Sequence, residues 1–266
     1  MVNKLFSELS KLPEVQAIAL GGSRAGTAFD EKSDYDVYLY CTGNVEENVR
    51  KNIPEKYCKY IEIGNHFWEY EDNCTLNNGI DIDILYRNLE DFCNDVASVV
   101  EDCKGRNGYT TCMWHNLKNC KIIYDENGNL EKAKERFNVE YPKKLQQSII
   151  ERNMKLLSGT MPAYDMQIKK AVNRNDYVSI NHRVSAFLES YFDIIFAMNK
   201  LTHPGEKRLV QLCKRDCKIL PDNFESNLDA LFKNMFTNTA NVEKALQNIV
   251  TEISRCLERN NIIFQG

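Results

Sequence analysis

The stretch GGSRAGT at residues 21–27, followed by SDYDVYLY at residues 33–40, decides the fold that we expect for this chain. An apolar run at residues 15–20 leads into the first segment, and the second carries Asp34 and Asp36 in a run with the composition of a strand. Side chains two positions apart on a strand point to the same face, with backbones roughly 6.5 Å apart. The two carboxylates can therefore converge on shared cations.

The residue types in these two segments suit the binding of a triphosphate. Divalent ions such as Mg²⁺ bind carboxylate and phosphate oxygens, and two ions about 3.5–4 Å apart can activate a hydroxyl and stabilise a leaving oxygen. Gly21 and Gly22 lack the Cβ atoms that would keep backbone N–H groups away from a phosphate, Ser23 adds a hydroxyl donor, and Arg24 can neutralise charge. A Gly-Gly turn alone is usually only a turn, and Asp-x-Asp alone is usually a solvated strand face. Their ordered combination favours a nucleotide site.

The spacing of these residues resembles a known signature. Gly22-Ser23 followed eleven residues after the serine by Asp34-x-Asp36 is similar to the motif of the DNA polymerase beta-type nucleotidyltransferase superfamily. Members add a third carboxylate on a later strand, and the segment GIDIDILY at residues 79–86 offers Asp81 and Asp83 on one face. The family's carboxylate tends to lie well inside an apolar strand, which favours Asp83 and leaves Asp81 as the alternative.

The C-terminal half extends the resemblance. Residues 182–209 look like part of the helical domain found beside small-molecule nucleotidyltransferases, including the aminoglycoside and lincosamide adenylyltransferases. Strand patterns dominate up to Leu130 and helical patterns follow, with a long apolar stripe at residues 176–200. We therefore expect an α+β protein: a small mixed β-sheet nucleotidyltransferase domain at residues 1–141 and an all-α helical bundle domain at residues 142–266, with the active site in the cleft between them.

The resemblance implies a reaction and a set of roles. Asp34, Asp36 and Asp83 would bind Mg²⁺, and Gly22, Ser23 and Arg24 would bind the phosphates of ATP or another nucleoside triphosphate. Lys207, in the first turn of a helix near Pro204, would reach the phosphates from the second domain; a plain surface lysine is at least an equal interpretation. The implied activity is transfer of AMP to a hydroxyl of a small molecule, with an aminoglycoside or lincosamide antibiotic as the suggested acceptor. The alternatives are a non-catalytic nucleotide-binding or antitoxin-like partner protein, and an enzyme that nucleotidylates protein or RNA.

Composition limits the partners that we expect. The 266 residues carry 34 Lys+Arg against 38 Asp+Glu, a net charge of −4, which lacks the basic excess of a nucleic-acid-binding surface. No apolar stretch approaches the roughly 20 residues that span a bilayer, so no membrane association is predicted. The ten cysteines contain no C-x-x-C pair and no signal peptide precedes them, so we expect reduced thiols in the cytoplasm.

Local patterns predict the individual elements. His66, Trp68 and Tyr70 would form one aromatic face of a strand, more often a packing surface than a ligand site. Residues 111–119 look irregular. Glu189 and Asp193, four positions apart on one helix, are more often a solvent-facing pair than a catalytic or substrate-binding one. The predicted strands are residues 15–20, 35–41, 57–63, 66–71, 79–87 and 120–125, and the predicted helices before residue 130 are residues 3–12, 45–52 and a helix capped by Asn88.

Overall fold

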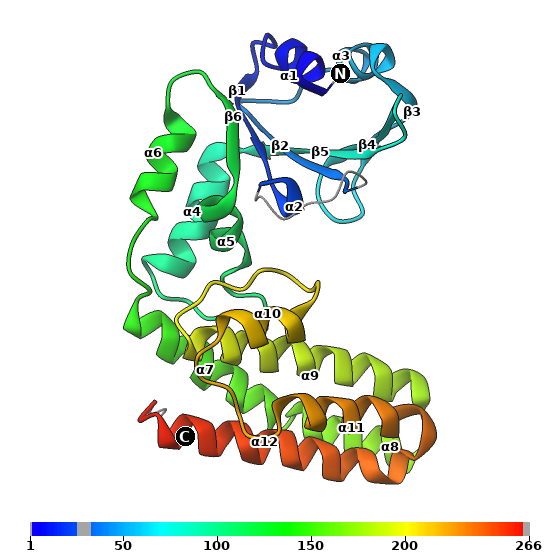
Figure 1. Ribbon diagram of the computed structural model, residues 1–266, viewed down its shortest axis with the longest axis vertical. Coiled ribbons are helices and arrows are strands. Elements are labelled where there is room, and N and C mark those ends of the chain that lie inside the picture. The colour runs from blue at the N-terminus through cyan, green and yellow to red at the C-terminus, as the bar shows by residue number, and fades with distance from the viewer. Residues whose placement is uncertain (1, 26–32, 263–266) are drawn as a thin grey trace. The chain divides into compact units, whose positions relative to one another are not determined.

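The computed structural model describes residues 2–25 and 33–262 (Figure 1). The chain forms two compact units. The sheet unit comprises Met1–Ala97 and Met113–Val139, and the helical unit comprises Ser98–Cys112 and Glu140–Gly266. The division into domains after residue 141 stays a prediction. None of the helices within the described residues has the length and apolar character needed to cross a membrane.

The sheet unit contains a mixed six-stranded sheet in the order β3-β4-β5-β2-β1-β6. β2 and β5 are parallel, and the other neighbouring pairs are antiparallel. Together with the helices that follow, this confirms the predicted α+β class. The strands are β1 (Val15–Leu20), β2 (Tyr35–Cys41), β3 (Cys58–Asn65), β4 (Glu71–Leu76), β5 (Asp81–Asn88) and β6 (Lys121–Asp125).

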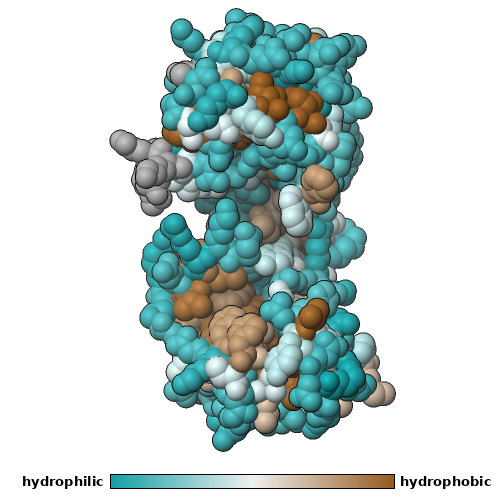
Figure 2. Space-filling model, turned by 90° about the vertical axis from the view of Figure 1, so that its right-hand side faces the viewer, coloured by the Kyte–Doolittle hydropathy of each residue, from teal (hydrophilic) through white to brown (hydrophobic). Residues whose placement is uncertain are grey.

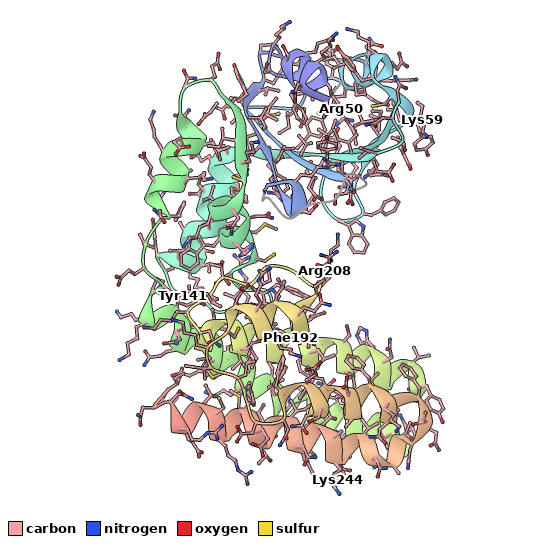
Figure 3. All side chains as sticks on the ribbon, in the orientation of Figure 1. Arg50, Lys59, Tyr141, Phe192, Arg208 and Lys244 are labelled. Carbon is pink, nitrogen blue, oxygen red and sulfur yellow. The ribbon has the colours of Figure 1, made fainter. Side chains whose placement is uncertain are left out.

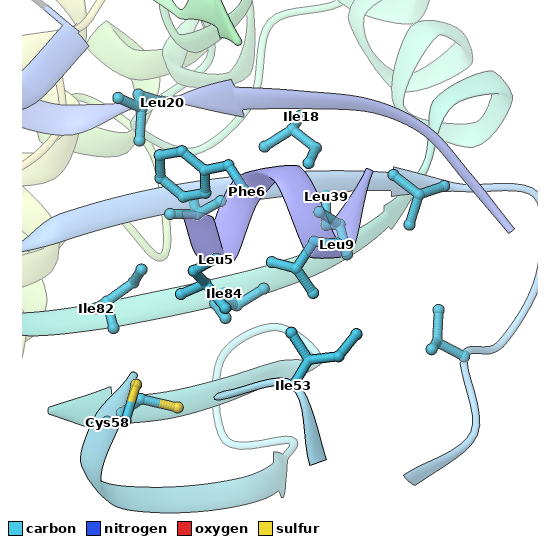
Figure 4. Close-up of a cluster of buried hydrophobic side chains, with 14 of the residues drawn as sticks. Leu5, Phe6, Leu9, Ile18, Leu20, Leu39, Ile53, Cys58, Ile82 and Ile84 are labelled. Carbon is cyan, nitrogen blue, oxygen red and sulfur yellow. The ribbon is translucent and has the colours of Figure 1, made fainter. Parts of the chain in front are cut away.

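One face of this sheet is apolar, and its burial determines which side chains lie on the opposite face. Val37 and Leu39 of β2 and Ile82 and Ile84 of β5 are buried in one core cluster with the apolar side of α1 (Val2–Leu9). Figure 4 shows Leu39, Ile82 and Ile84 together with Leu5, Phe6 and Leu9 of the helix. Because side chains alternate along a strand, the residues between them point to the opposite face. Asp36 and Asp83 therefore lie on the face away from this core.

The short helices of the sheet unit are held by specific caps. The backbone N–H of Asp91 donates to Asn88 Oδ1 at 3.0 Å, which confirms the predicted cap. Asp125 accepts from the N–H groups of Asn129 at 3.0 Å and Glu131 at 2.9 Å and so stabilises the first turn of a helix that begins at Asn129, close to where the helical patterns begin. The helices here are α2 (Gly22–Ala25), α3 (Glu47–Asn52), α4 (Leu89–Val100), α5 (Cys112–Asn119) and α6 (Asn129–Arg136), with a 3₁₀ turn at Pro54–Lys56.

Two local predictions in this unit are wrong. Residues 112–119 form α5 rather than an irregular segment; only Trp114 and Leu117, three positions apart, are buried, so the helical pattern is short and weak. Residues 66–70 connect β3 to β4 rather than forming a strand. The ring of His66 stacks on Tyr70 at 4.4 Å across this connection, and Trp68 is 89 % exposed.

The helical unit is organised around α9 (Tyr177–Met198), which confirms the long helix predicted for residues 176–200. Asp176 caps it by accepting a hydrogen bond from the N–H of Ser179 at 3.0 Å. Most of the predicted apolar stripe is buried, and Tyr177 near the start of the helix is exposed. The buried members are Ile180, Val184, Phe187, Tyr191 and Ile195. The other helices are α7 (Lys143–Leu157), α8 (Tyr164–Asn173), α10 (Leu209–Asp216), α11 (Phe224–Thr237) and α12 (Val242–Arg259), with a 3₁₀ turn at Thr239–Asn241.

Asp193 of α9 is buried, which overturns the expectation of a solvent-facing pair for this residue. Its carboxylate accepts from Thr110 twice, from the N–H at 3.1 Å and from Oγ1 at 2.6 Å, and from Asn153 Nδ2 at 3.2 Å. Asn153 in turn accepts from the N–H of Gly108 at 3.1 Å and donates to the carbonyl of Arg106 at 3.0 Å. This network, which we call the Asp193 network, fastens the segment 105–111 to α7 and α9.

Burial of Asp193 makes the stability of the helical unit depend on pH. Burial raises the pKa of Asp193 to about 7, and the hydrogen bonds from Thr110 and Asn153 oppose the rise. The folded chain therefore holds a proton that the unfolded chain has released, so this group destabilises the fold increasingly as pH rises from about 4 to about 7. We expect Asp193→Asn, which cannot ionise, to gain up to about 4 kcal/mol relative to wild type across that window.

The measurement is urea unfolding of both proteins at several pH values. Asp229→Asn, an exposed carboxylate on α11, is the matched control and should follow the wild-type profile. Parallel profiles for wild type and Asp193→Asn would contradict the assignment.

Candidate active site

Asp36 and Asp83 occupy the same level on neighbouring strands. In the parallel pairing of β2 with β5, their Cα atoms are register partners. Neighbouring strands lie about 4.8 Å apart, so the two half-buried carboxylates are side by side on the face away from the core. Asp34 comes directly before β2 and is exposed. The structure thus brings together two of the three predicted carboxylates and places the third one step outside the strand.

Asp81 lies two residues before Asp83 and has a different environment. It is exposed and accepts a hydrogen bond from Thr75 Oγ1 at 2.8 Å. Asp83 instead accepts from Asn73 Nδ2 at 2.7 Å, and Asn73 itself accepts from the side chain of Asn65. This chain of amides orients Asp83 at the level of Asp36. The choice of Asp83 as third ligand stays a prediction, and this geometry is consistent with it.

The Gly-Gly turn packs directly on the carboxylate strand. The N–H of Gly21 donates to the carbonyl of Asp36 at 2.8 Å. A Cβ on Gly21 would lie 2.5 Å from Tyr38 Oη, and one on Gly22 would overlap Asp36 Oδ2 and lie 2.9 Å from Asp36 Cγ. Gly22 also has a φ of +54°, a conformation that side chains disfavour. Both glycines are therefore required by their neighbours on β2, whatever they bind.

Ser23 and Arg24 follow in α2, which begins at Gly22, and Ser23 is exposed. Arg24 Nε donates to the carbonyls of Ser33 at 2.6 Å and Asp34 at 3.1 Å, and its guanidinium lies 3.9 Å from the centre of the Tyr35 ring. Arg24 thus ties the turn to the residues before β2. Its predicted contact with phosphate stays a prediction, and Gly26 and Thr27 of the same motif lie outside the described residues.

The Tyr38 ring, against which Gly21 packs, is itself held in place by other side chains. Arg87 forms two hydrogen bonds to the carboxylate of Glu69, at 2.6 and 2.7 Å, and its guanidinium lies 4.0 Å from the centre of the Tyr38 ring. Tyr38 Oη donates to Asn116 Oδ1 at 2.9 Å, and burial raises the pKa of Tyr38 to about 12. Tyr38 is therefore a neutral, fixed ring against which Gly21 packs.

Glu71 is a member of this face that sequence reasoning did not identify. On β4 it lies beside Leu85, and Asn73 lies beside Asp83, so all four side chains share the carboxylate face. Burial raises the pKa of Glu71, the charges of Asp83, Glu69 and Asp36 raise it further, and a hydrogen bond with Asn73 opposes them. Glu71 thus adds negative charge close to Asp36 and Asp83. The period-two alternation of Glu71, Asn73 and Thr75 was the available signal.

The carboxylates on this face of the sheet suit Mg²⁺ as a partial set of ligands. No group of three or more His, Cys, Asp or Glu side chains in the part of the chain that the structure describes is arranged as a complete metal site. Mg²⁺ usually keeps several waters and is held by one or two carboxylates together with substrate phosphates. The adjacent carboxylates of Asp36 and Asp83 match that incomplete set.

Lys207 belongs to the helical unit. It is exposed in the turn before α10, which begins at Leu209, so the prediction that it lies in the first turn of a helix is wrong. The residue between them, Arg208, has a φ of +58° at the position before the helix. The contact of Lys207 with a triphosphate stays a prediction.

Comparisons with known proteins give limited likenesses. A family model described as a domain of unknown function (DUF4037) matches residues 110–209, less than half of the chain. A search of curated proteins found no match.

Three solved structures resemble the chain at low identity. A nucleotidyltransferase-like protein from Exiguobacterium sibiricum 255-15 is 11% identical with a TM-score of 0.44, over 97% of this chain and 73% of that one. An aminoglycoside 6-adenyltransferase from Bacillus subtilis is 9% identical with a TM-score of 0.29, over 100% and 91%. The Thermotoga maritima CCA-adding enzyme, solved with tRNA, is 11% identical with a TM-score of 0.30, over 98% and 80%. These likenesses are too weak to assign a function, and the geometry of Asp36, Asp83 and the Gly-Gly turn is the stronger indication of one.

The close packing of Gly22 on Asp36 can be tested by adding one methyl group. Gly22→Ala must move the Asp36 carboxylate and accept an unfavourable φ, so we expect the free energy of unfolding to fall by at least about 1 kcal/mol. Gly43→Ala is the control, because a Cβ there would meet nothing within 4 Å. Equal stability of the two variants in urea unfolding would show that the turn does not pack on Asp36.

Proposed function

We propose that this protein is a metal-dependent nucleotidyltransferase that moves a nucleoside monophosphate, AMP from ATP, onto a hydroxyl of a small molecule. The observation that carries the proposal is the side-by-side placement of Asp36 and Asp83 beside the Gly-Gly turn. Carboxylates next to a backbone turn that approaches so closely are what a Mg²⁺–triphosphate complex needs.

In this proposal each residue has a defined role. Asp34 and Asp36 would hold the ions that accompany the triphosphate, and Asp83, oriented by Asn73, would complete the set of carboxylates that holds them. Gly22 and Ser23 bind the β- and γ-phosphates, and Arg24 supplies positive charge beside them. Bound Mg²⁺ would supply charge neutralisation and would lower the pKa of the attacking hydroxyl.

The proposed reaction is an in-line displacement at the α-phosphorus. The acceptor oxygen forms a bond to the α-phosphorus, the bond to the bridging oxygen of the β-phosphate breaks, and pyrophosphate leaves. The hydroxyl proton passes to a carboxylate of the site, with Asp83 as the proposed acceptor. Positioning and charge neutralisation provide most of the catalysis, as in phosphoryl transfer generally.

The acceptor class is proposed from the sequence resemblance and the charge of the chain. A net charge of −4 does not favour a nucleic acid, so we propose a small molecule, with aminoglycosides and lincosamides as the first to test. Transfer of label from α-labelled ATP to small molecules, to protein or to RNA separates this proposal from nucleotidylation of macromolecules. A cytoplasmic location is part of the same proposal.

Nucleotide binding should depend on both the metal and the β2 carboxylates. In calorimetric titrations with a non-hydrolysable ATP analogue, we expect Mg²⁺ to strengthen binding and the Asp34→Asn/Asp36→Asn double variant to lose at least about tenfold in affinity, because the shared ion loses its ligands. Asp229→Asn on α11 makes the same change at a residue of the helical unit that has no part in the proposed site, and it should bind as wild type does. Binding of no nucleotide at all would favour the non-catalytic partner protein.

The third carboxylate can be assigned with a pair of matched variants on one strand. Asp83→Asn removes a carboxylate at the level of Asp36, and Asp81→Asn removes one bonded to Thr75. We expect Asp83→Asn to weaken Mg²⁺-dependent binding of the analogue by about tenfold or more and Asp81→Asn to leave it within about twofold. The reverse order would assign the role to Asp81.

A further inference from the structure

The helical unit contains a cavity of about 420 Å³ that the carboxylate site does not use. It lies between α9, α10, α11 and the segment 98–112, so its lining belongs wholly to this unit. Phe192 on α9 and Arg208 before α10 are labelled in Figure 3. Its volume is within the usual range of small-molecule pockets. The apolar lining consists of Leu188, Phe192, Leu209, Val210, Leu228 and Phe232.

Four of these six apolar side chains are accessible to a ligand, and Phe192 and Leu228 lie buried behind them. Figure 2 shows one face of the molecule as largely hydrophilic, with hydrophobic side chains reaching the surface in a few clusters. Phe232 of the cavity lining is 47 % exposed, and Leu188, Leu209 and Val210 are half-buried. Apolar residues thus make up half of the lining, which is enough to bind the body of an organic molecule while the polar residues orient it.

One carboxylate in the cavity has no protein partner. Glu189 of α9 is half-buried, and within residues 2–25 and 33–262 its side chain makes no hydrogen bond or ion pair. Burial raises the pKa of Glu189, and the charge of His182 opposes that rise. The other charged residues of the lining, Glu206 and Arg208, are exposed and opposite in sign. The lining therefore has a net charge of −1, and its least solvated charge is Glu189.

The wall beside Glu189 is held in an unusual backbone conformation. Gly108 and Tyr109 have φ values of +78° and +51°, and a Cβ on Gly108 would lie 2.8 Å from Glu189 Cβ. A tyrosine with positive φ is strained, and such strain persists where surrounding contacts fix the chain. Here the Asp193 network fixes it, through Asn153 to Gly108 and through Asp193 to Thr110.

This conformation brings the Tyr109 ring into the lining of the same cavity. The ring packs edge-on against His203 with centroids 4.8 Å apart. Burial raises the pKa of Tyr109, and the charges of Glu189 and Glu206 raise it further, so its hydroxyl remains neutral beside two carboxylates. The cavity thus combines a preformed aromatic ring with an unpaired carboxylate.

We propose that this cavity binds a small organic monoamine, with its ammonium group at Glu189 and its apolar body against the side chains of α9, α10 and α11. A cation balances the unpaired carboxylate, and the nearby faces of aromatic rings attract an ammonium group. A single positive charge matches the net charge of the lining, whereas an anion would face two carboxylates. This binding does not depend on nucleotidyl transfer.

The test compares three probes of similar size on the whole protein without nucleotide. They are 2-phenylethylamine, the neutral 2-phenylethanol and the anionic 3-phenylpropanoate, titrated calorimetrically at about pH 8, where the amine is protonated and carboxylates are ionised. We expect saturable binding of the amine and at least about tenfold weaker binding of the alcohol and the acid. No saturable amine binding up to about 10 mM, or equal binding of amine and alcohol, overturns the proposal.

Variants locate the binding on the structure. Glu189→Gln keeps the shape of the side chain and removes its charge, so we expect about tenfold weaker amine binding with little change for the alcohol. Glu258→Gln, an exposed position on α12 outside the lining, should bind the amine as wild type does. Ser185→Trp, an exposed lining position on α9, should abolish binding by filling the cavity. Unchanged amine affinity in Glu189→Gln or in Ser185→Trp overturns the assignment.

Discussion

The parallel pairing of β2 with β5 is the constraint on which the carboxylate site depends. It places Asp36 directly beside Asp83, and like charges opposite each other on neighbouring strands are unfavourable. The apolar faces of the same strands compensate, because Val37, Leu39, Ile82 and Ile84 are buried in the core cluster. A slip of one residue would move the carboxylates into that core, so the hydrophobic face fixes the register that the charged face needs.

The sequence predicted this face where the pattern is local. Residues 15–20 and 35–41 form strands with the predicted bounds, because their side chains are buried in almost unbroken runs. The pairing of Asp36 with Asp83 was beyond local patterns, since β2 and β5 are far apart in sequence. β4 was missed because Asp72 occupies a buried position in it. The Asp72 carboxylate can be buried because it has partners from three other segments. They are Arg50 at 3.4 Å, the N–H of Gly64 at 2.8 Å and Tyr86 Oη at 2.8 Å.

The two glycines of the turn are constrained by packing within the protein. Their absent side chains were interpreted as room for a phosphate, which stays a prediction. The structure adds a requirement within the protein, since Gly21 packs on Tyr38 and Gly22 on the Asp36 carboxylate. The same glycines thus determine where the carboxylate lies, so internal packing alone is a sufficient reason for glycine at both positions.

Asp193 follows the same physical logic in the helical unit. A charged residue four positions from Glu189 was expected to face solvent, yet it is buried because its partners, Thr110 and Asn153, lie far away in sequence. Burying a carboxylate is unfavourable unless hydrogen bonds compensate. Here those bonds fix the left-handed backbone at Gly108 and Tyr109. Each unit therefore contains an unfavourable arrangement that surrounding contacts maintain: the adjacent carboxylates of Asp36 and Asp83, and the left-handed backbone at residues 108–109. Both arrangements lie at the sites that we propose to bind ligands.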